Sequence, residues 1–201
     1  MRTREVTLNQ GGTVLMTLLT RDDFASVDAP VRNFEGVQPP GSSLQAAFGT
    51  PEHRAGVLER DFAICGIDTY TTPFHALSVL HAALIRALSV RTSGWELPLA
   101  GPIGITEVVH QLAGLQVRLR LIPRSAFWRY LTGTKDGSGS QSGVIVTGTG
   151  FESTDVGRLL VWGDGREAQI IFFDSSTSVE VDVPWDATGS YTVYDAATGI
   201  L

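Results

Sequence analysis

The residues best suited to chemistry are one cysteine, Cys65, and four histidines, His53, His75, His81 and His110. A cysteine nucleophile needs a neighbouring base or a helix N-terminus to lower its pKa, and Cys65 lies inside an apolar strand-like run. We therefore interpret it as a small buried residue. His75 and His81 are six positions apart, which places them about 240° apart around a helix, so they cannot share a metal ion. The spacing predicts no catalytic thiol and no metal site.

Glycine-rich and acidic segments give no catalytic motif either. Gly148-Thr149-Gly150 lacks the Gly-Lys-Ser/Thr ending of a phosphate-binding loop. The segment Asp136–Ser140 lacks the further ligands and the closing glutamate of a calcium loop. No Gly-x-Ser-x-Gly motif occurs, and the acidic residues do not form a spaced catalytic pair. An active site built from distant residues would leave no such trace, but we predict a non-enzymatic protein without cofactor.

Two groups of residues are candidates for binding other molecules. Arginines with neighbouring aromatics at the end of a predicted strand could form a subunit interface: Arg118, Arg120, Arg124, Phe127, Trp128 and Arg129. A solvated strand face is the alternative for the arginines, and the aromatics could instead cap the core. Trp162 and Trp185 are candidate glycan or partner contacts, provided that both are exposed in one groove.

Composition limits the function classes. The chain has 201 residues, 43% of them hydrophobic, and a formal net charge of −6. These values exclude a mainly disordered chain and argue against a nucleic-acid surface, which needs clustered positive charge. A single cysteine cannot form an internal disulfide. The apolar run Thr13–Leu19 is too short to cross a bilayer and has no cleavage site after it, so we expect no signal peptide and no membrane insertion.

The second half of the chain has the pattern of a small all-β domain, a sandwich or a barrel. Five short β-branched runs alternate with turn residues: Val144–Thr147, Arg158–Trp162, Ala168–Phe173, Val179–Val183 and Tyr191–Tyr194. Gly163-Asp164-Gly165 predicts a tight hairpin with positive φ at the Asp-Gly pair. Strict alternation predicts that Val179, Val181 and Val183 face the core.

The first half predicts an α+β domain with one helix on a curved antiparallel sheet, so the protein is expected to be mainly β. Thr72 and Pro73 are typical of a helix start, and apolar residues at helical spacing extend the helix to about residue 89, namely Phe74, Leu77, Leu80, Leu84 and Leu88. Strands are predicted at Val57–Ile67, Trp95–Leu99 and Leu115–Leu121. The segment Arg32–Gly56 is interpreted as a long irregular excursion of the kind that often binds a partner.

A stretch without apolar side chains, Gly133–Gly143, predicts a Gly/Ser linker between domains 1–132 and 144–201. The charge differs on its two sides. Residues 1–132 carry 12 arginines and 11 acidic residues, a net charge of +1, whereas residues 133–201 carry three basic and ten acidic residues, a net charge of −7. We therefore expect two modules of different electrostatic character.

Part of the second half resembles a small β module of tailed-bacteriophage virion proteins. The residues that carry the resemblance run from Val146 through Gly148-Thr-Gly-Phe151 and Asp155-Val-Gly-Arg158, then from Ala168 to Val183, and close with Ser190–Tyr194. They cover about a quarter of the chain. Such modules recur in tail fibres, hubs and nozzle proteins, so the resemblance implies a phage particle more than a position within it.

The first half resembles, more weakly, the distal tail and baseplate-hub proteins of long-tailed phages. The similarity lies in the order of the predicted elements: a strand at Leu58–Ile64, a helix containing Leu80–Leu88, a Trp-bearing hairpin and an alternating strand ending at Ile122–Trp128. The excursion and the small second module depart from that pattern. The resemblance implies a homo-oligomeric ring, a hexamer, located in the virion tail after synthesis in the host cytoplasm and bound to tube, hub or fibre proteins. A glycan-binding module for host attachment and a head-to-tail connector or tail-completion ring are the alternatives.

Overall fold

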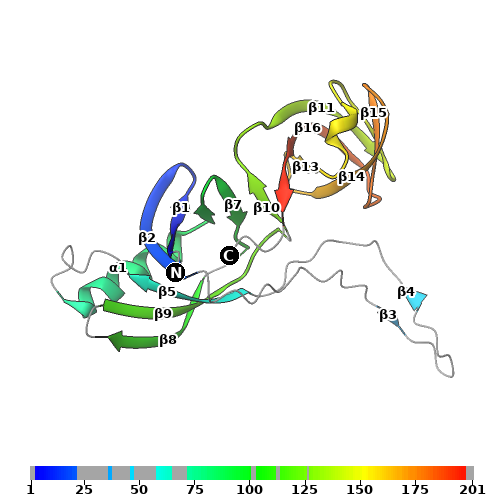
Figure 1. The fold of residues 1–201 in the computed structure, drawn as a ribbon. Helices are drawn as coiled ribbons and strands as arrows, with labels where there is room; N and C mark the ends of the chain where they lie inside the picture. Colours follow the sequence, from blue (N-terminus) through cyan, green and yellow to red (C-terminus); the bar gives the residue numbers. More distant parts are fainter. Residues whose placement is uncertain are drawn as a thin grey trace. The chain divides into compact units, whose positions relative to one another are not determined.

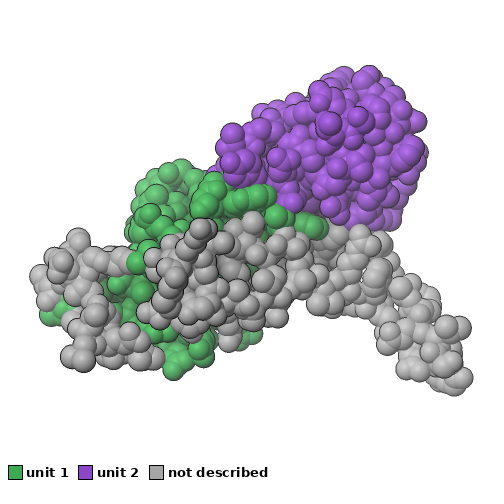
Figure 2. Space-filling view, in the orientation of Figure 1, with its two compact units in different colours: residues 1–30, 55–128, 197–201 green, residues 31–54, 129–196 purple. Residues whose placement is uncertain are grey.

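The computed structural model describes residues 3–21, 36–37, 46–47, 58–64, 72–100, 103–111, 114–125 and 127–197. The protein is mainly β, as the sequence predicts, with helix α1 as the only α-helix in these residues (Figure 1). The chain divides into two compact units, one formed by residues 1–30, 55–128 and 197–201 and the other by residues 31–54 and 129–196 (Figure 2). Each unit is described by itself.

A nine-stranded sheet contains all the long strands of the first unit. Its strand order is β17-β10-β7-β6-β1-β2-β5-β9-β8. The strands are β1 (Thr3–Gln10), β2 (Thr13–Arg21), β5 (Leu58–Ile64), β6 (Ser89–Thr92), β7 (Trp95–Pro98), β8 (Gly104–Gln111), β9 (Gly114–Leu121), β10 (Trp128–Tyr130) and β17 (Ala196–Ala197). The predicted strands near residues 57–67, 95–99 and 115–121 are therefore present as β5, β7 and β9. The apolar run Thr13–Leu19 lies in β2.

Strand β9 has the alternation that the sequence predicts. Leu115, Val117, Leu119 and Leu121 are buried, and Arg118 and Arg120 are exposed on the other face. β9 lies between β5 and β8 and pairs antiparallel with both. One face of this strand therefore belongs to the core of the first unit, together with Phe62 and Ile64 of β5.

Helix α1 (Pro73–Arg86) begins where the sequence predicts. The Thr72 hydroxyl accepts a hydrogen bond from the backbone N–H of His75 at 3.1 Å, and Pro73 occupies the first turn. The predicted apolar face was partly wrong, because Phe74 and Leu88 are 80% and 60% exposed. The helix instead packs through a stripe rich in alanine: Ala76, Leu80, Ala83, Leu84 and Ala87. It ends before residue 89 because β6 begins there.

Most of the predicted excursion Arg32–Gly56 lies outside the described residues. Its described part is a short antiparallel pair, β3 (Gly36–Val37) with β4 (Ala46–Ala47).

The second unit contains a closed six-stranded barrel, which settles the choice between sandwich and barrel. Its strand order is β11-β12-β15-β14-β13-β16, with the ring closed by the β11–β16 pair. The strands are β11 (Lys135–Ser142), β12 (Ile145–Thr147), β13 (Leu159–Trp162), β14 (Glu167–Ser175), β15 (Ser178–Val181) and β16 (Ala187–Tyr194). All five predicted strand regions are present. As predicted, Val179, Val181 and Val183 are buried.

The prediction of a Gly/Ser linker at 133–143 was wrong. Lys135–Ser142 is strand β11, which pairs with β16 from Lys135 opposite Val193 to Gln141 opposite Ala187. Its glycines are required by close packing. A Cβ on Gly139 would overlap the carbonyl oxygen of Thr147, and a Cβ on Gly137 would lie 2.5 Å from Cζ of Tyr191. A second domain starting at residue 144 would therefore lack one of the six barrel strands.

The predicted hairpin joins β13 to β14. Trp162 and Arg166 close it through a hydrogen bond from the Trp162 N–H to the Arg166 carbonyl at 2.8 Å. Within this loop, Gly165 has positive φ (89°) and Asp164 does not. The loop is thus a three-residue connection with one left-handed residue at its end, a common hairpin type, and not a turn with two positive φ angles.

Candidate functional site

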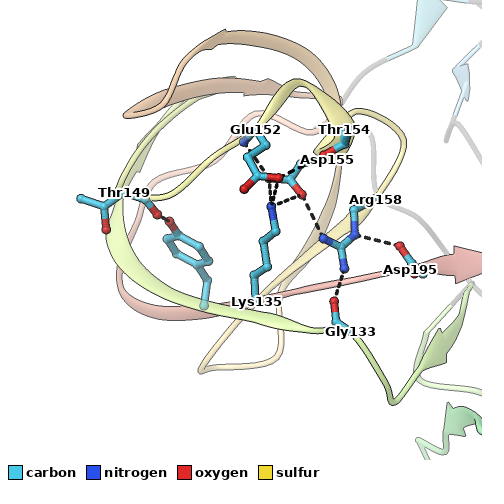
Figure 3. A network of polar contacts seen from close by, with 9 residues as sticks. Gly133, Lys135, Thr149, Glu152, Thr154, Asp155, Arg158 and Asp195 are labelled. Carbon is cyan, nitrogen blue, oxygen red and sulfur yellow. Dashed lines mark hydrogen bonds and ion pairs between the residues drawn. The ribbon is translucent and has the colours of Figure 1, made fainter.

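The most strongly buried charge in the described part of the chain is the carboxylate of Asp155, at the end of the short 3-10 helix η3 (Ser153–Asp155). Its side chain is 1% exposed. Lys135 Nζ lies 3.1 Å from Asp155 Oδ1, and Arg158 Nη1 donates to the same oxygen at 2.9 Å. The N–H of Glu152 donates to Asp155 Oδ2 at 2.9 Å. Figure 3 shows the two cations meeting at this carboxylate.

Both cations also bind other segments. Lys135 Nζ lies 3.0 Å from Glu152 Oε2. Arg158 Nη2 donates to the carbonyl of Gly133 at 2.7 Å, and its Nε lies 2.8 Å from Asp195 Oδ1. The cluster therefore joins the start of β11, the η3 turn, the residue before β13 and the residue after β16 (Figure 3). We refer to Lys135, Glu152, Asp155, Arg158 and Asp195 as the Asp155 cluster.

The environment keeps the Asp155 cluster charged. Burial alone would raise the pKa of Asp155, but hydrogen bonds from the Glu152 N–H, Arg158 and Lys135 outweigh it, so the pKa is lowered from its ordinary value of 3.8. Burial would lower the pKa of Lys135, but its hydrogen bonds to Glu152 and Asp155 outweigh this effect and raise the pKa. A carboxylate and an ammonium held in their charged forms are poor proton-transfer groups at neutral pH. The arrangement is suited to holding segments together.

A second buried group surrounds Tyr191 on β16. Its ring stacks on Phe151 with centroids 5.6 Å apart and contacts Trp162 edge-on at 5.4 Å. Trp162 Nε1 donates to Gln141 Oε1 at 3.0 Å, and Gln141 Nε2 donates to the carbonyl of Val183 at 2.8 Å. These polar groups satisfy one another inside the barrel.

The predicted glycan groove is contradicted by this packing. Trp162 is only 3% exposed, so its ring cannot stack on a sugar. Trp185 is half-buried, and the guanidinium of Arg166 lies 6.0 Å from the centre of its ring. The sequence favours Trp185, which directly follows Pro184, as the more exposed of the two tryptophans, and in the structure it is the less buried one.

The residues of the predicted arginine and aromatic interface differ in their burial and in their contacts. Arg118 and Arg120 share the outer face of β9, where Arg118 Nη1 pairs with Glu107 Oε2 at 3.1 Å. Arg124 is exposed beyond the end of β9 and Phe127 is half-buried. Trp128, in contrast, belongs to the buried core of the first unit.

Arg129 is engaged inside the second unit. Its Nη2 pairs with Glu167 Oε2 at 2.9 Å, and both side chains are nearly buried, at 14% and 10% exposed. Its guanidinium also lies 5.6 Å from the centre of the Tyr194 ring. Trp128 and Arg129 therefore both take part in internal packing, and their role in a subunit interface stays a prediction.

Among the remaining chemically interesting residues, the structure describes the side chains of His75 and His81. Cys65 and His53 lie outside the described residues, as does the side chain of His110, while His75 and His81 are exposed on α1. Within the residues that the structure describes, no group of three or more His, Cys, Asp or Glu side chains could hold a metal ion. No helix in the same residues is long and apolar enough to cross a membrane.

Sequence reasoning missed a group of exposed side chains on the outside of the barrel. Ile145, Ile171 and Phe172 are 50%, 51% and 54% exposed. Glu180 on β15 lies directly opposite Ile145 on one side and Phe172 on the other. The sequence signal was the run Ile170-Ile-Phe-Phe173, which is longer than alternation in a half-exposed strand allows.

No family model matches the chain, and no curated protein matches it. Among solved structures, the chain is similar to the Dit protein (gp 19.1) of phage SPP1, described as a paradigm of the hub adsorption apparatus in phages that infect Gram-positive bacteria. The superposition has a TM-score of 0.43 at 10% sequence identity and covers 96% of this chain and 99% of that chain.

Proposed function

We propose that the chain is a non-enzymatic structural component of a tailed-phage tail, a ring-forming distal tail protein that joins the tube to the tip or fibres. The assignment to a phage tail rests on the sequence resemblance quoted above. The residues of that resemblance occupy the β12–η3–β13 segment and strands β14 to β16 in the second unit. In the first unit they follow the order β5, α1, the β6–β7 hairpin and β9.

The observation that carries the assembly role is the contrast between the two sheets. The barrel is closed, so each of its strands has two neighbours and no edge is free. The nine-stranded sheet is open and ends at the eight-residue strand β8, which pairs with β9 alone among the described strands. A free strand edge offers unpaired backbone groups to another chain. We assign assembly to the open sheet and display to the acidic barrel.

Heterologous contacts that repeat by rotation close into a ring. A strand edge on one copy that meets a different surface on the next copy is such a contact. The near-neutral first half, with a net charge of +1 over residues 1–132, suits close packing of several copies better than the acidic second half.

Native mass spectrometry and hydrogen exchange on the purified chain test this proposal together. We expect a discrete closed oligomer whose β8 peptides, residues 104–111, exchange more slowly in the oligomer than after dilution to monomer. An oligomer with unprotected β8 would overturn the role of this edge. A chain that stays monomeric at high concentration and is absent from particles of the encoding phage would overturn the proposed function. Locating the chain at the neck of the particle would favour the connector alternative.

A further inference from the structure

The outer face of the barrel carries an apolar surface built across three neighbouring strands. We call it the β14 face and define it by Ile145 on β12, Ile171 and Phe172 on β14, and Glu180 on β15. Residues directly opposite each other on antiparallel strands project to the same side, about 5 Å apart. Glu180 is opposite both Ile145 and Phe172, so it lies between these two exposed apolar side chains.

A β-bulge in β14 creates this face. Ile170 pairs with Val181 and Phe172 pairs with Glu180, so Ile171 is an extra residue in the strand. The bulge leaves both Ile171 and Phe172 more than half exposed, while Phe173, opposite the buried Val179, packs against the barrel core. Strict alternation would have placed Phe172 inside with Ile170. Bulges that re-aim side chains in this way are typical of functional positions.

The carboxylate in the middle of the β14 face has no counter-ion among the residues that the structure describes. Glu180 is half-buried, and its side chain makes no hydrogen bond or ion pair within the part of the chain that the structure describes. The four basic side chains of residues 129–197 are engaged elsewhere: Arg129 with Glu167, Lys135 and Arg158 with Asp155, and Arg166 with Asp164. Ten acidic residues lie in the same range. A carboxylate between apolar side chains is stabilised when a cation pairs with it.

We propose that the β14 face docks another protein through a surface that presents an arginine or lysine between apolar side chains. The apolar residues of the partner would cover Ile145, Ile171 and Phe172, and the cation would pair with Glu180. The face is poorly suited to a two-fold contact with a second copy, because the two Glu180 carboxylates would meet without a cation from either face. This inference goes beyond the ring-forming role proposed for the first unit, since it concerns a protein that docks on the outer face of the barrel.

The test uses the full chain with its isoleucine δ1 methyl groups labelled for NMR, titrated with the peptide acetyl-Leu-Arg-Leu-amide. We expect the Ile145 and Ile171 signals to shift and to saturate with a dissociation constant on the order of millimolar, as suits a ligand of this size. The methyl group of Ile85, which is 78% exposed on α1, serves as an internal control and should not move. The matched peptide acetyl-Leu-Glu-Leu-amide should bind at least about tenfold more weakly, a difference of about 1.4 kcal/mol.

Two variants test whether Glu180 and Phe172 bind the peptides. Glu180→Gln should remove the preference for the arginine peptide, and Phe172→Ser should weaken both peptides. Phe74→Ser, which changes an exposed phenylalanine outside the face, should leave the titration unchanged. Equal binding of the two peptides, or no shift of Ile145 and Ile171 up to the solubility of the arginine peptide, would overturn the proposal. So would shifts of these methyl groups on simple dilution of the chain, because the occupant would then be a second copy.

Discussion

The ring of Tyr191 lies so close to Gly137 that a Cβ at this glycine would be 2.5 Å from Cζ of the tyrosine. Gly148 approaches the same ring from another strand connection. The ring itself is held by stacking on Phe151 and by the edge of Trp162. The glycines of β11 and of the turn after β12 thus make the room in which the barrel core closes.

This packing predicts that glycines of β11 do not tolerate alanine. Gly139→Ala should destabilise the barrel by about 3 kcal/mol or more, because the new methyl group would overlap the backbone of Thr147 and Gly148. The free energy of unfolding can be measured by urea titration followed through the Ile170 methyl signal. Gly12→Ala is the matched control, since no atom lies within 4 Å of a Cβ there. An unchanged midpoint for Gly139→Ala would contradict the close packing of β11.

The Asp155 cluster should contribute strongly to stability. Asp155→Asn removes the buried negative charge and leaves Lys135 and Arg158 facing each other around a neutral amide. Breaking a buried pair from one side costs about 3–5 kcal/mol, and the partial exposure of Lys135 places the expected loss near the lower end. The same urea titration measures this loss as a change in the free energy of unfolding. Asp174→Asn is the control, because Asp174 is exposed and its change should stay within about 0.5 kcal/mol.

The stability of the barrel should fall in acid. The pKa of Asp155 is lower in the folded protein than its ordinary value of 3.8. The charged form is therefore bound more favourably in the folded state, and its contribution is complete above pH 3.8 and is lost as the pH falls through the lowered pKa. Unfolding free energy measured from neutral pH downward should decline more steeply below this value in the parent chain than in Asp155→Asn. Identical acid slopes for the two proteins would show that another carboxylate dominates.

The Arg129–Glu167 ion pair should stabilise the folded second unit. Arg129→Met leaves the nearly buried Glu167 carboxylate without its arginine, with an expected loss of about 3 kcal/mol in unfolding free energy. The double variant Arg129→Met/Glu167→Leu should recover much of this loss, because no uncompensated charge remains. Native mass spectrometry should give the same oligomeric state for the parent and double-variant proteins. A changed oligomer with unchanged stability would instead support the interface role that the sequence suggests for Arg129.

Local patterns in the sequence were sufficient to predict the structure of a residue where its neighbours in the chain determine that structure. Thr72 and Pro73 predicted the start of α1, because a hydroxyl acceptor and a proline satisfy the first turn without help from elsewhere. The alternation in β9 and in Val179–Val183 predicted which side chains are buried. Even there the last detail depended on packing, since alanines, and not Phe74 and Leu88, join Leu80 and Leu84 in the buried stripe of α1.

The candidate contact residues were predicted less well, because the same residue types serve inside and outside a protein. Trp162 is buried since Gln141 accepts its indole N–H, and Arg129 is nearly buried since Glu167 neutralises it. Gln141 and Glu167 lie 21 and 38 residues away from these side chains. The β14 face was missed for a similar reason, because the bulge that exposes Phe172 is defined only by pairing with β15.

Composition and short-range patterns were enough to predict a mainly β chain with one capped helix, a tight hairpin at Gly163–Gly165 and an acidic second half, because they act through neighbouring residues. That Lys135–Ser142 is a barrel strand and not a linker is evident only from its pairing in the folded protein. Its glycines look flexible in isolation, but in the fold they are the positions where Tyr191 and the backbone of Thr147 approach too closely for any side chain. Glycine has no side chain and therefore adds nothing to the hydrophobic alternation by which a strand is predicted. A strand that packs closely through its glycines is recognised only from its pairing with neighbouring strands.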